Sequence, residues 1–180
     1  MRKILLLAGL AIALGVATAG AVGVGIEAYG GASVPILQGD RASGSTWGVR
    51  VPVNVVPFMT VEPYYSSGSY GDETLSTIAG PITRDGGKVT AWGANLLLSA
   101  GGPAFKFYPF VGLGSNKDQR AATADVKNTG YNFGLGVGLG LPMKLGLDVR
   151  GEVQMVVSGD VSRKFANATA GLSYHFLTLP

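Results

Sequence analysis

The sequence predicts an all-β protein, an eight-stranded antiparallel up-and-down transmembrane β-barrel preceded by a signal peptide. Three observations support this prediction. Segments of about ten residues alternate apolar residues with glycine or polar ones, as strands with two different faces do. The connections between these segments alternate long and short, and aromatic residues gather near both ends of the predicted strands.

The composition fits one β-rich domain. The chain has 180 residues, of which 29 are glycine, 47% are hydrophobic and only 14% are charged. This hydrophobic content argues against a disordered chain, and the length leaves no room for a second domain. The absence of cysteine excludes disulfides, thiolate metal sites and a lipidated amino-terminal cysteine.

The first 21 residues form the predicted signal peptide. Arg2 and Lys3 precede an apolar run, and small residues then provide A-x-A patterns for cleavage after Ala19 or Ala21. An uncleaved helical anchor is the alternative, because the run is almost long enough to span a bilayer. Without Arg2 and Lys3, the mature chain has 12 basic and 11 acidic residues. Its net charge is therefore no indication of nucleic-acid binding.

Residues 22–180 are predicted to form the barrel. In its second segment Trp47 and Val49 alternate with Gly48 and Arg50, which gives one apolar and one polar face. Each segment is bounded by Gly, Pro, Asn, Asp or Ser. The eight predicted strands are 22–32, 45–54, 57–66, 88–99, 105–114, 130–142, 144–156 and 164–176.

The strand 130–142 has the sharpest alternation. Its glycines at 134, 136, 138 and 140 face one way, and large apolar residues face the other. Eight strands enclose an interior just wide enough for side chains, so a glycine face makes room for large or charged residues from neighbouring strands. Glycine kinks in a soluble sheet are the alternative. The facing of strands 88–99 and 105–114 stays ambiguous.

Alternation alone does not separate a membrane barrel from a soluble sandwich, since both have one apolar face per strand. The long connections, predicted as extracellular loops at 33–44, 67–87, 115–128 and 157–163, alternate with short turns, as in outer-membrane barrels. The aromatics fall into two belts. The outer belt comprises Trp47, Tyr65, Trp92, Tyr131, Phe133 and Phe165, and the inner belt comprises Phe58, Phe105, Phe107, Tyr174 and Phe176.

The predicted interior face collects charged residues of both signs. Unpaired charges are costly in a narrow, poorly hydrated interior, so we expect these groups to pair. Two interpretations remain open: a salt-bridged plug, which the small number of strands favours, or a gate along an ion path. The residues of this charge network are Glu27, Arg50, Glu62, Asp148, Arg150 and Glu152, with Lys106 as the seventh if the strand 105–114 turns that face inward.

Catalytic and metal sites are not expected. His175 and Ser173 share a face, but they lie at the predicted periplasmic mouth, with no acid adjacent in sequence to orient the ring. One histidine and no cysteine make a zinc site improbable, and no cofactor motif is present. The basic loop residues are expected to be solvated, with weak binding of lipopolysaccharide phosphates as the alternative. They are Arg41, Arg84, Lys117, Arg120, Arg163 and Lys164.

The segments FYPFVGLG, NFGLGVGLGLP and AGLSYHF resemble small bacterial outer-membrane barrels of the outer-membrane-protein-A and X type. The resemblance covers nearly all of the mature chain. It implies an interior salt-bridge network and recognition by the barrel-assembly machinery through Phe176, with apolar residues at alternate positions before it. Leu177 to Pro180 extend beyond that aromatic residue. Lipid-modifying relatives use a histidine and a serine near the outer leaflet, which is the opposite end from His175.

These observations favour a monomeric barrel in the outer membrane of a Gram-negative-type bacterium, exported by the Sec route. We expect a structural or surface-interaction role, with outer-membrane lipids, lipopolysaccharide and a possible extracellular ligand at the loops as partners. The alternative is a narrow porin-like channel or small-ligand conduit. A lipid-modifying enzyme is the least favoured function.

Overall fold

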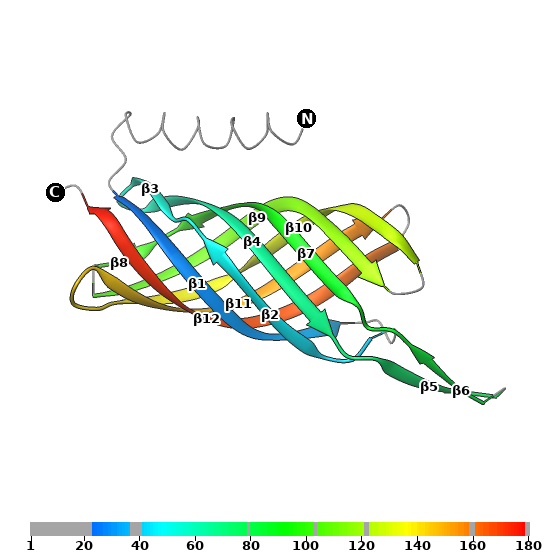
Figure 1. Cartoon of the computed structure of the whole chain (residues 1–180). Coiled ribbons are helices and arrows are strands. Elements are labelled where there is room, and N and C mark those ends of the chain that lie inside the picture. Colours follow the sequence, from blue (N-terminus) through cyan, green and yellow to red (C-terminus); the bar gives the residue numbers. More distant parts are fainter. Residues whose placement is uncertain are drawn as a thin grey trace.

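The computed structural model describes residues 23–36, 41–78, 80–102, 104–120, 123–158 and 161–178. Its strands close into an eight-stranded antiparallel barrel, as the sequence predicts (Figure 1). The predicted signal peptide lies outside the described residues. Within the part of the chain described, no helix has the length and apolar character needed to cross a bilayer.

Each strand of the barrel pairs with its neighbours in the sequence, and the last strand pairs with the first. The strand β1 runs antiparallel to β12, from Gly23 opposite Thr178 to Ile36 opposite Lys164. This pairing leaves no open edge in the barrel wall. The wall strands are β1 (Gly23–Ile36), β2 (Gly44–Arg50) with β3 (Val53–Val56), β4 (Met59–Tyr70), β7 (Lys88–Leu98), β9 (Phe105–Arg120), β10 (Thr123–Gly140), β11 (Leu145–Ser158) and β12 (Val161–Thr178).

Three short strands lie at the two ends of the barrel. A two-residue strand, β8 (Ala100–Gly101), pairs with the start of β9. The strands β5 (Glu73–Thr77) and β6 (Gly80–Arg84) form a hairpin that projects beyond the barrel (Figure 1). We call the end with this hairpin the hairpin end, and the end where Gly23 pairs with Thr178 the terminal end.

The break between β2 and β3 coincides with Pro52. Proline has no backbone N–H and cannot donate to the ladder. The flanking groups maintain the pairing, because Val51 N donates to Pro63 O at 2.9 Å and Pro52 O accepts from Gly25 N at 3.0 Å. The predicted second strand is therefore one wall strand in two pieces.

Alternation sets the two faces of the wall, and the glycine strand shows this most clearly. Gly134, Gly136 and Gly138 face the interior, while Phe133, Leu135 and Leu139 of β10 are exposed on the outside. The same alternation settles the ambiguous strands: Ala91, Asn95 and Leu97 of β7, and Lys106, Tyr108 and Phe110 of β9, point inward.

The strands are longer than predicted at the hairpin end. The predicted loop 115–128 is wrong, because β9 continues to Arg120 and β10 begins at Thr123. The ladder of β11 and β12 likewise continues to Ser158 opposite Val161. Asn116 and Asn128 lie within this predicted loop, but they are buried interior residues of continuing strands.

The outer aromatic belt also needs one correction. Phe165 is only 1% exposed and lies inside the barrel, whereas the other predicted belt residues face outward. The alternation of β12 runs unbroken from Asn167 to Phe165, so both point to the interior. The exposed belt at the hairpin end is therefore Trp47, Tyr65, Trp92, Tyr131 and Phe133.

Candidate functional site: the barrel interior

Arg150 is the centre of a buried ion-pair network. From β11, it holds Glu62 of β4 in a two-pronged contact, with Nη1–Oε1 and Nη2–Oε2 distances of 2.6 and 2.7 Å. Its Nε donates to Asp148 Oδ1 at 2.6 Å, and Nη2 lies 3.4 Å from Glu27 Oε2. One guanidinium therefore binds three carboxylates, which is the fork geometry that distinguishes arginine from lysine.

Arg50 of β2 is the second cation of this network. Its Nη1 donates to Glu27 Oε1 at 2.8 Å and Nη2 to Thr169 Oγ1 at 3.4 Å. Its guanidinium lies over the Tyr29 ring, 3.6 Å from the centroid. Glu62 and Asp148 are each 3.8 Å away from an Arg50 nitrogen. Both arginines therefore contact all three carboxylates.

Neutral donors complete the network. Asn95 Nδ2 donates to Glu62 Oε1 at 3.0 Å, and Tyr108 donates its hydroxyl to Asp148. The network holds two formal positive and three formal negative charges, and its members are at most 5% exposed. These additional hydrogen bonds matter because buried carboxylates are stable only when their oxygens are satisfied.

The interior glycines of β10 make room for the side chains of β9. The register places Gly134 opposite Phe110, Gly136 opposite Tyr108 and Gly138 opposite Lys106. A Cβ on Gly136 would lie 2.3 Å from the Tyr108 ring, and one on Gly138 would lie 2.5 Å from Lys106 Cε. These glycines therefore let Tyr108 of β9 reach over β10 to Asp148 of β11.

Two of the seven predicted network residues stay outside it. Lys106 faces the interior with Nζ 5.7 Å from the Tyr108 ring centroid, and it makes no ion pair in the described structure. Glu152 accepts a hydrogen bond from Asn167 Nδ2 at 3.1 Å and has no cationic partner among the described residues. Glu152 lies on the predicted interior face, and the structure decides the open facing of 105–114 by turning Lys106 inward, but neither residue forms an ion pair with the other charged groups of the interior.

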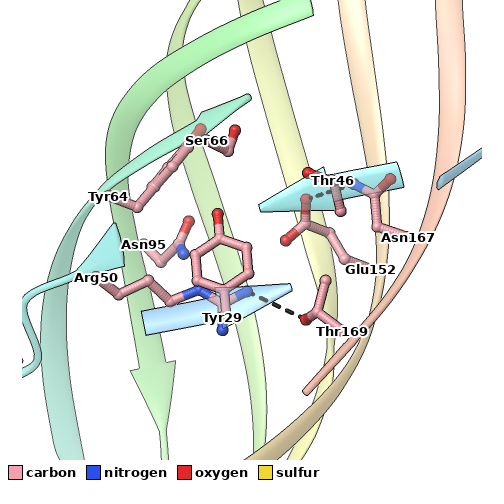
Figure 2. A pocket seen from close by; sticks show the side chains of 9 residues that line it. All are labelled: Tyr29, Thr46, Arg50, Tyr64, Ser66, Asn95, Glu152, Asn167 and Thr169. Atoms are coloured by element: carbon pink, nitrogen blue, oxygen red, sulfur yellow. Dashed lines mark hydrogen bonds between the residues drawn. The ribbon is translucent and has the colours of Figure 1, made fainter. Parts of the chain in front are cut away.

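Glu152 instead lines a small cavity on the hairpin side of the network (Figure 2). Figure 2 shows Arg50 and its Thr169 partner at one end of this cavity, and Glu152 with Asn167 at the side. The cavity has a volume of about 10 Å³, which is room for about one water molecule. The other lining residues are Tyr29, Thr46, Tyr64, Ser66 and Asn95.

A second buried cluster, the hairpin-end cluster, lies beyond this cavity. It consists of Arg41, Tyr70, Asp118, Arg163 and Phe165. Arg41 Nη2 contacts both Asp118 carboxylate oxygens at 3.1 and 3.0 Å, and Arg163 pairs with the same carboxylate. The Arg41 guanidinium lies 5.2 Å from the Tyr70 ring and 5.7 Å from the Phe165 ring.

Sequence reasoning missed this cluster. Arg41 was expected to be solvated, but it is only 2% exposed. Its position in a predicted loop gave no signal of burial. The alternation of β9 could have indicated that Asp118 shares the interior face of Asn116, and the alternation of β12 that Arg163 shares the face of Phe165.

The Ser173–His175 pair lies at the terminal end of β12. The hydroxyl of Ser173 donates to Gly146 O at 3.3 Å, and its oxygen is 3.5 Å from His175 Nε2. Among the described residues, the side chain of His175 contacts Ser173, and no carboxylate lies within hydrogen-bond or ion-pair distance of its ring. A catalytic triad instead needs an acid to orient the imidazole.

Comparisons with known proteins show the fold. No protein-family model and no curated protein sequence matches the chain. Among solved structures, Neisserial surface protein A aligns with a TM-score of 0.70 at 14% identity, covering 87% of this chain and 99% of that one. The chain has the fold of a small eight-stranded outer-membrane barrel.

Two further structures are similar to this barrel. The N-terminal barrel domain of Pseudomonas aeruginosa OprF aligns with a TM-score of 0.57 at 15% identity, covering 87% of this chain and 99% of that one. Ail of Yersinia pestis, in complex with the heparin analogue sucrose octasulfate, aligns with a TM-score of 0.54 at 13% identity, covering 86% and 99%. At these identities the likeness extends to the barrel fold and not to its ligands.

Proposed function

We propose that this chain is a bacterial outer-membrane barrel with a structural or surface-interaction role, and that its interior is a plug. The observation that carries the proposal is the filled interior. The charge network crosses the barrel from β1 and β2 to β4 and β11, and the hairpin-end cluster fills the space beyond it. The cavity between them has room for about one water molecule.

The outer surface supports insertion in a membrane. Trp47, Trp92 and Tyr131 are about half exposed toward the hairpin end, and Phe105 and Phe176 toward the terminal end. Aliphatic residues such as Leu135 and Val149 are exposed between them. An apolar band between two aromatic belts is typical of transmembrane barrels.

The surface role is supported by the β5–β6 hairpin. It extends past the barrel end and carries exposed Ile78 and Ile82. In an outer-membrane orientation with both strand termini on the periplasmic side, this hairpin is extracellular.

A gel-mobility experiment tests the barrel and its location. Outer-membrane fractions are run with and without boiling, and a folded barrel migrates differently from the unfolded chain. We expect the shift in that fraction. A chain that stays soluble, or remains in the inner membrane without a shift, contradicts the proposal.

Single-channel recording distinguishes a plugged interior from a gated ion channel. For a plug we expect no conductance steps from the wild type, and none from Arg150→Gln in protein that still shows the heat-dependent shift. Lys144→Gln at the terminal end is the matched control for loss of one charge. Steps that appear only with Arg150→Gln would support a gated channel instead.

We propose no enzymatic role. The Ser173 hydroxyl is bound to a backbone carbonyl, and the pair lies at the terminal end, away from the outer leaflet. The expected result is that His175→Ala leaves the acyl-chain composition of membrane lipids unchanged. A change in lipid composition that depends on His175 contradicts this part of the proposal.

A further inference from the structure

The hairpin of β5 and β6 continues the ladder of β4 and β7 beyond the barrel (Figure 1). Ser69 of β4 lies opposite Lys88 of β7, and Glu73 of β5 lies opposite Arg84 of β6. Both chain segments advance four residues between these two pairs, so the register does not shift. Trp92 of β7 faces outward, and Arg84 is an even number of residues away from it. Because side chains alternate, the hairpin face that carries Glu73 and Arg84 continues the outer face of the wall.

This outward face of the hairpin has an apolar centre. Leu75 lies opposite Ile82, whose side chain is 50% exposed. The other face carries Thr74 and Thr83, whose hydroxyl oxygens are 3.2 Å apart. An isolated two-stranded hairpin is only marginally stable in water, and an exposed apolar face indicates a surface that a partner covers. We call the outward residues the hairpin face, namely Glu73, Leu75, Thr77, Gly80, Ile82 and Arg84.

The hairpin face is complementary to a second copy of itself. Barrels that are inserted in one membrane in the same direction can form a two-fold dimer only about an axis normal to the membrane. When two hairpin faces meet across such an axis, β5 of each copy lies against β6 of the other at the same height. The register then places Glu73 against the second Arg84, and Leu75 against the second Ile82. Opposite charges and apolar side chains therefore meet their own kind of partner.

The neighbouring charges do not oppose this contact. Asp72 and Asp85 flank the base of the hairpin, and their carboxylates accept hydrogen bonds from the backbone N–H groups of Gly86 and Gly87 at 3.1 and 3.0 Å. On the wall below, the same symmetry places Lys88 of one copy toward Ser69 of the other. The outer face of the two ladders therefore brings no like charges directly together.

We propose that the hairpin face binds a second copy of this chain and so forms a two-fold dimer at the hairpin end. The proposal rests on the proposed membrane location, because the bilayer gives both copies the same orientation. It replaces the sequence-based expectation of a monomer. Confinement to one membrane also raises the effective concentration of the partner, so a contact as small as one hairpin face suffices.

Energy transfer between full chains folded in lipid vesicles tests the proposal. The chain has no cysteine, and a Cβ at Gly102 would meet nothing within 4 Å, so Gly102→Cys provides one site for donor or acceptor dyes at the terminal end. We expect transfer that rises with the protein-to-lipid ratio and saturates at one partner per barrel. Ile82→Thr should raise the dissociation constant about tenfold, because it removes buried apolar area from both copies. Thr83→Ser on the other face should change it less than about twofold.

A mixture of two charge variants distinguishes contacts between hairpins from contacts within one. Glu73→Arg places two cations on each hairpin face and Arg84→Glu two anions, so either variant alone should dimerise about tenfold more weakly at low salt. In an equimolar mixture each cationic face meets an anionic one, and we expect mixed dimers at least as stable as those of the wild type. A mixture that stays as weak as the single variants contradicts the proposal.

The remaining outcomes also overturn the inference. Dimers that Ile82→Thr leaves unchanged would be held by another surface. A polarity-sensitive dye at Ile82→Cys identifies other occupants: apolar surroundings in dilute vesicles would indicate lipid, and polar surroundings at every density would leave the face to a different protein. Folded barrels that stay monomeric contradict this inference alone, whereas absence of the heat-dependent gel shift contradicts the proposed function.

Discussion

The charge network and the hairpin-end cluster bury arginine in two different ways. Arg150 donates through Nε, Nη1 and Nη2 to three carboxylates. Arg41 donates through Nη2 to Asp118 alone, and its Nε and Nη1 have no hydrogen-bond partner in the described structure. Its guanidinium rests on the Tyr70 and Phe165 rings instead.

This difference indicates that the burial of a charged side chain does not by itself give its contribution to the free energy of unfolding. Loss of Arg150 would leave Glu62 and Asp148 without their strongest cation in a closed interior. Loss of Arg41 would leave Asp118 still paired with Arg163, which is partly exposed. We therefore expect the network to be sensitive to single substitutions and the hairpin-end cluster to be tolerant.

The largest expected effect follows from Arg150→Met. Methionine fills part of the volume but leaves the carboxylates uncompensated, so the free energy of unfolding should fall by about 3–5 kcal/mol. Urea titrations of the barrel in lipid vesicles measure this change. Arg84→Met in the exposed β6 strand is the control and should change it by less than about 0.5 kcal/mol. If Arg150→Met lowered the free energy of unfolding as little as Arg84→Met, the stabilising role of the charge network would be contradicted.

A second, smaller effect is expected for Gly136→Val, which tests the packing of the barrel wall beside the charge network. In Gly136→Val the new Cβ would lie 2.3 Å from the Tyr108 ring, which forces Tyr108 away from Asp148. Overpacking of this kind lowers the free energy of unfolding by about 1–3 kcal/mol. The control is Gly151→Val in the adjacent strand, because nothing lies within 4 Å of a Cβ at Gly151. Equal stability of the two variants would mean that Tyr108 has room to move.

The smallest of these effects is expected for Arg41→Met. Methionine keeps contact with the aromatic rings and removes two unsatisfied donors, so the free energy of unfolding should change by about 1 kcal/mol or less. The same urea titration measures it. A loss for Arg41→Met that equals the loss for Arg150→Met would erase the contrast between the two clusters.

The facing of residues could be predicted from the sequence wherever alternation was followed strictly. It placed Glu27, Arg50, Glu62, Asp148 and Arg150 on the interior face, where the structure has them. The error at Phe165 arose because its aromatic character was given more weight than its position two residues from Asn167. The strand ends were misjudged because polar residues occur both in loops and in a polar barrel interior.

The sequence by itself determined the closed β architecture, the two faces of each strand and the room left by the β10 glycines, because a strand has a fixed period of two. The tertiary structure alone decided which interior groups meet. Strands in a barrel are tilted and staggered, so residues that share the interior face lie at different heights along its axis. Arg150 therefore meets Glu62 across the barrel, 88 residues away in the chain. Lys106 lies near the Tyr108 ring and Glu152 accepts from Asn167, and in the described structure neither forms an ion pair with the charge network.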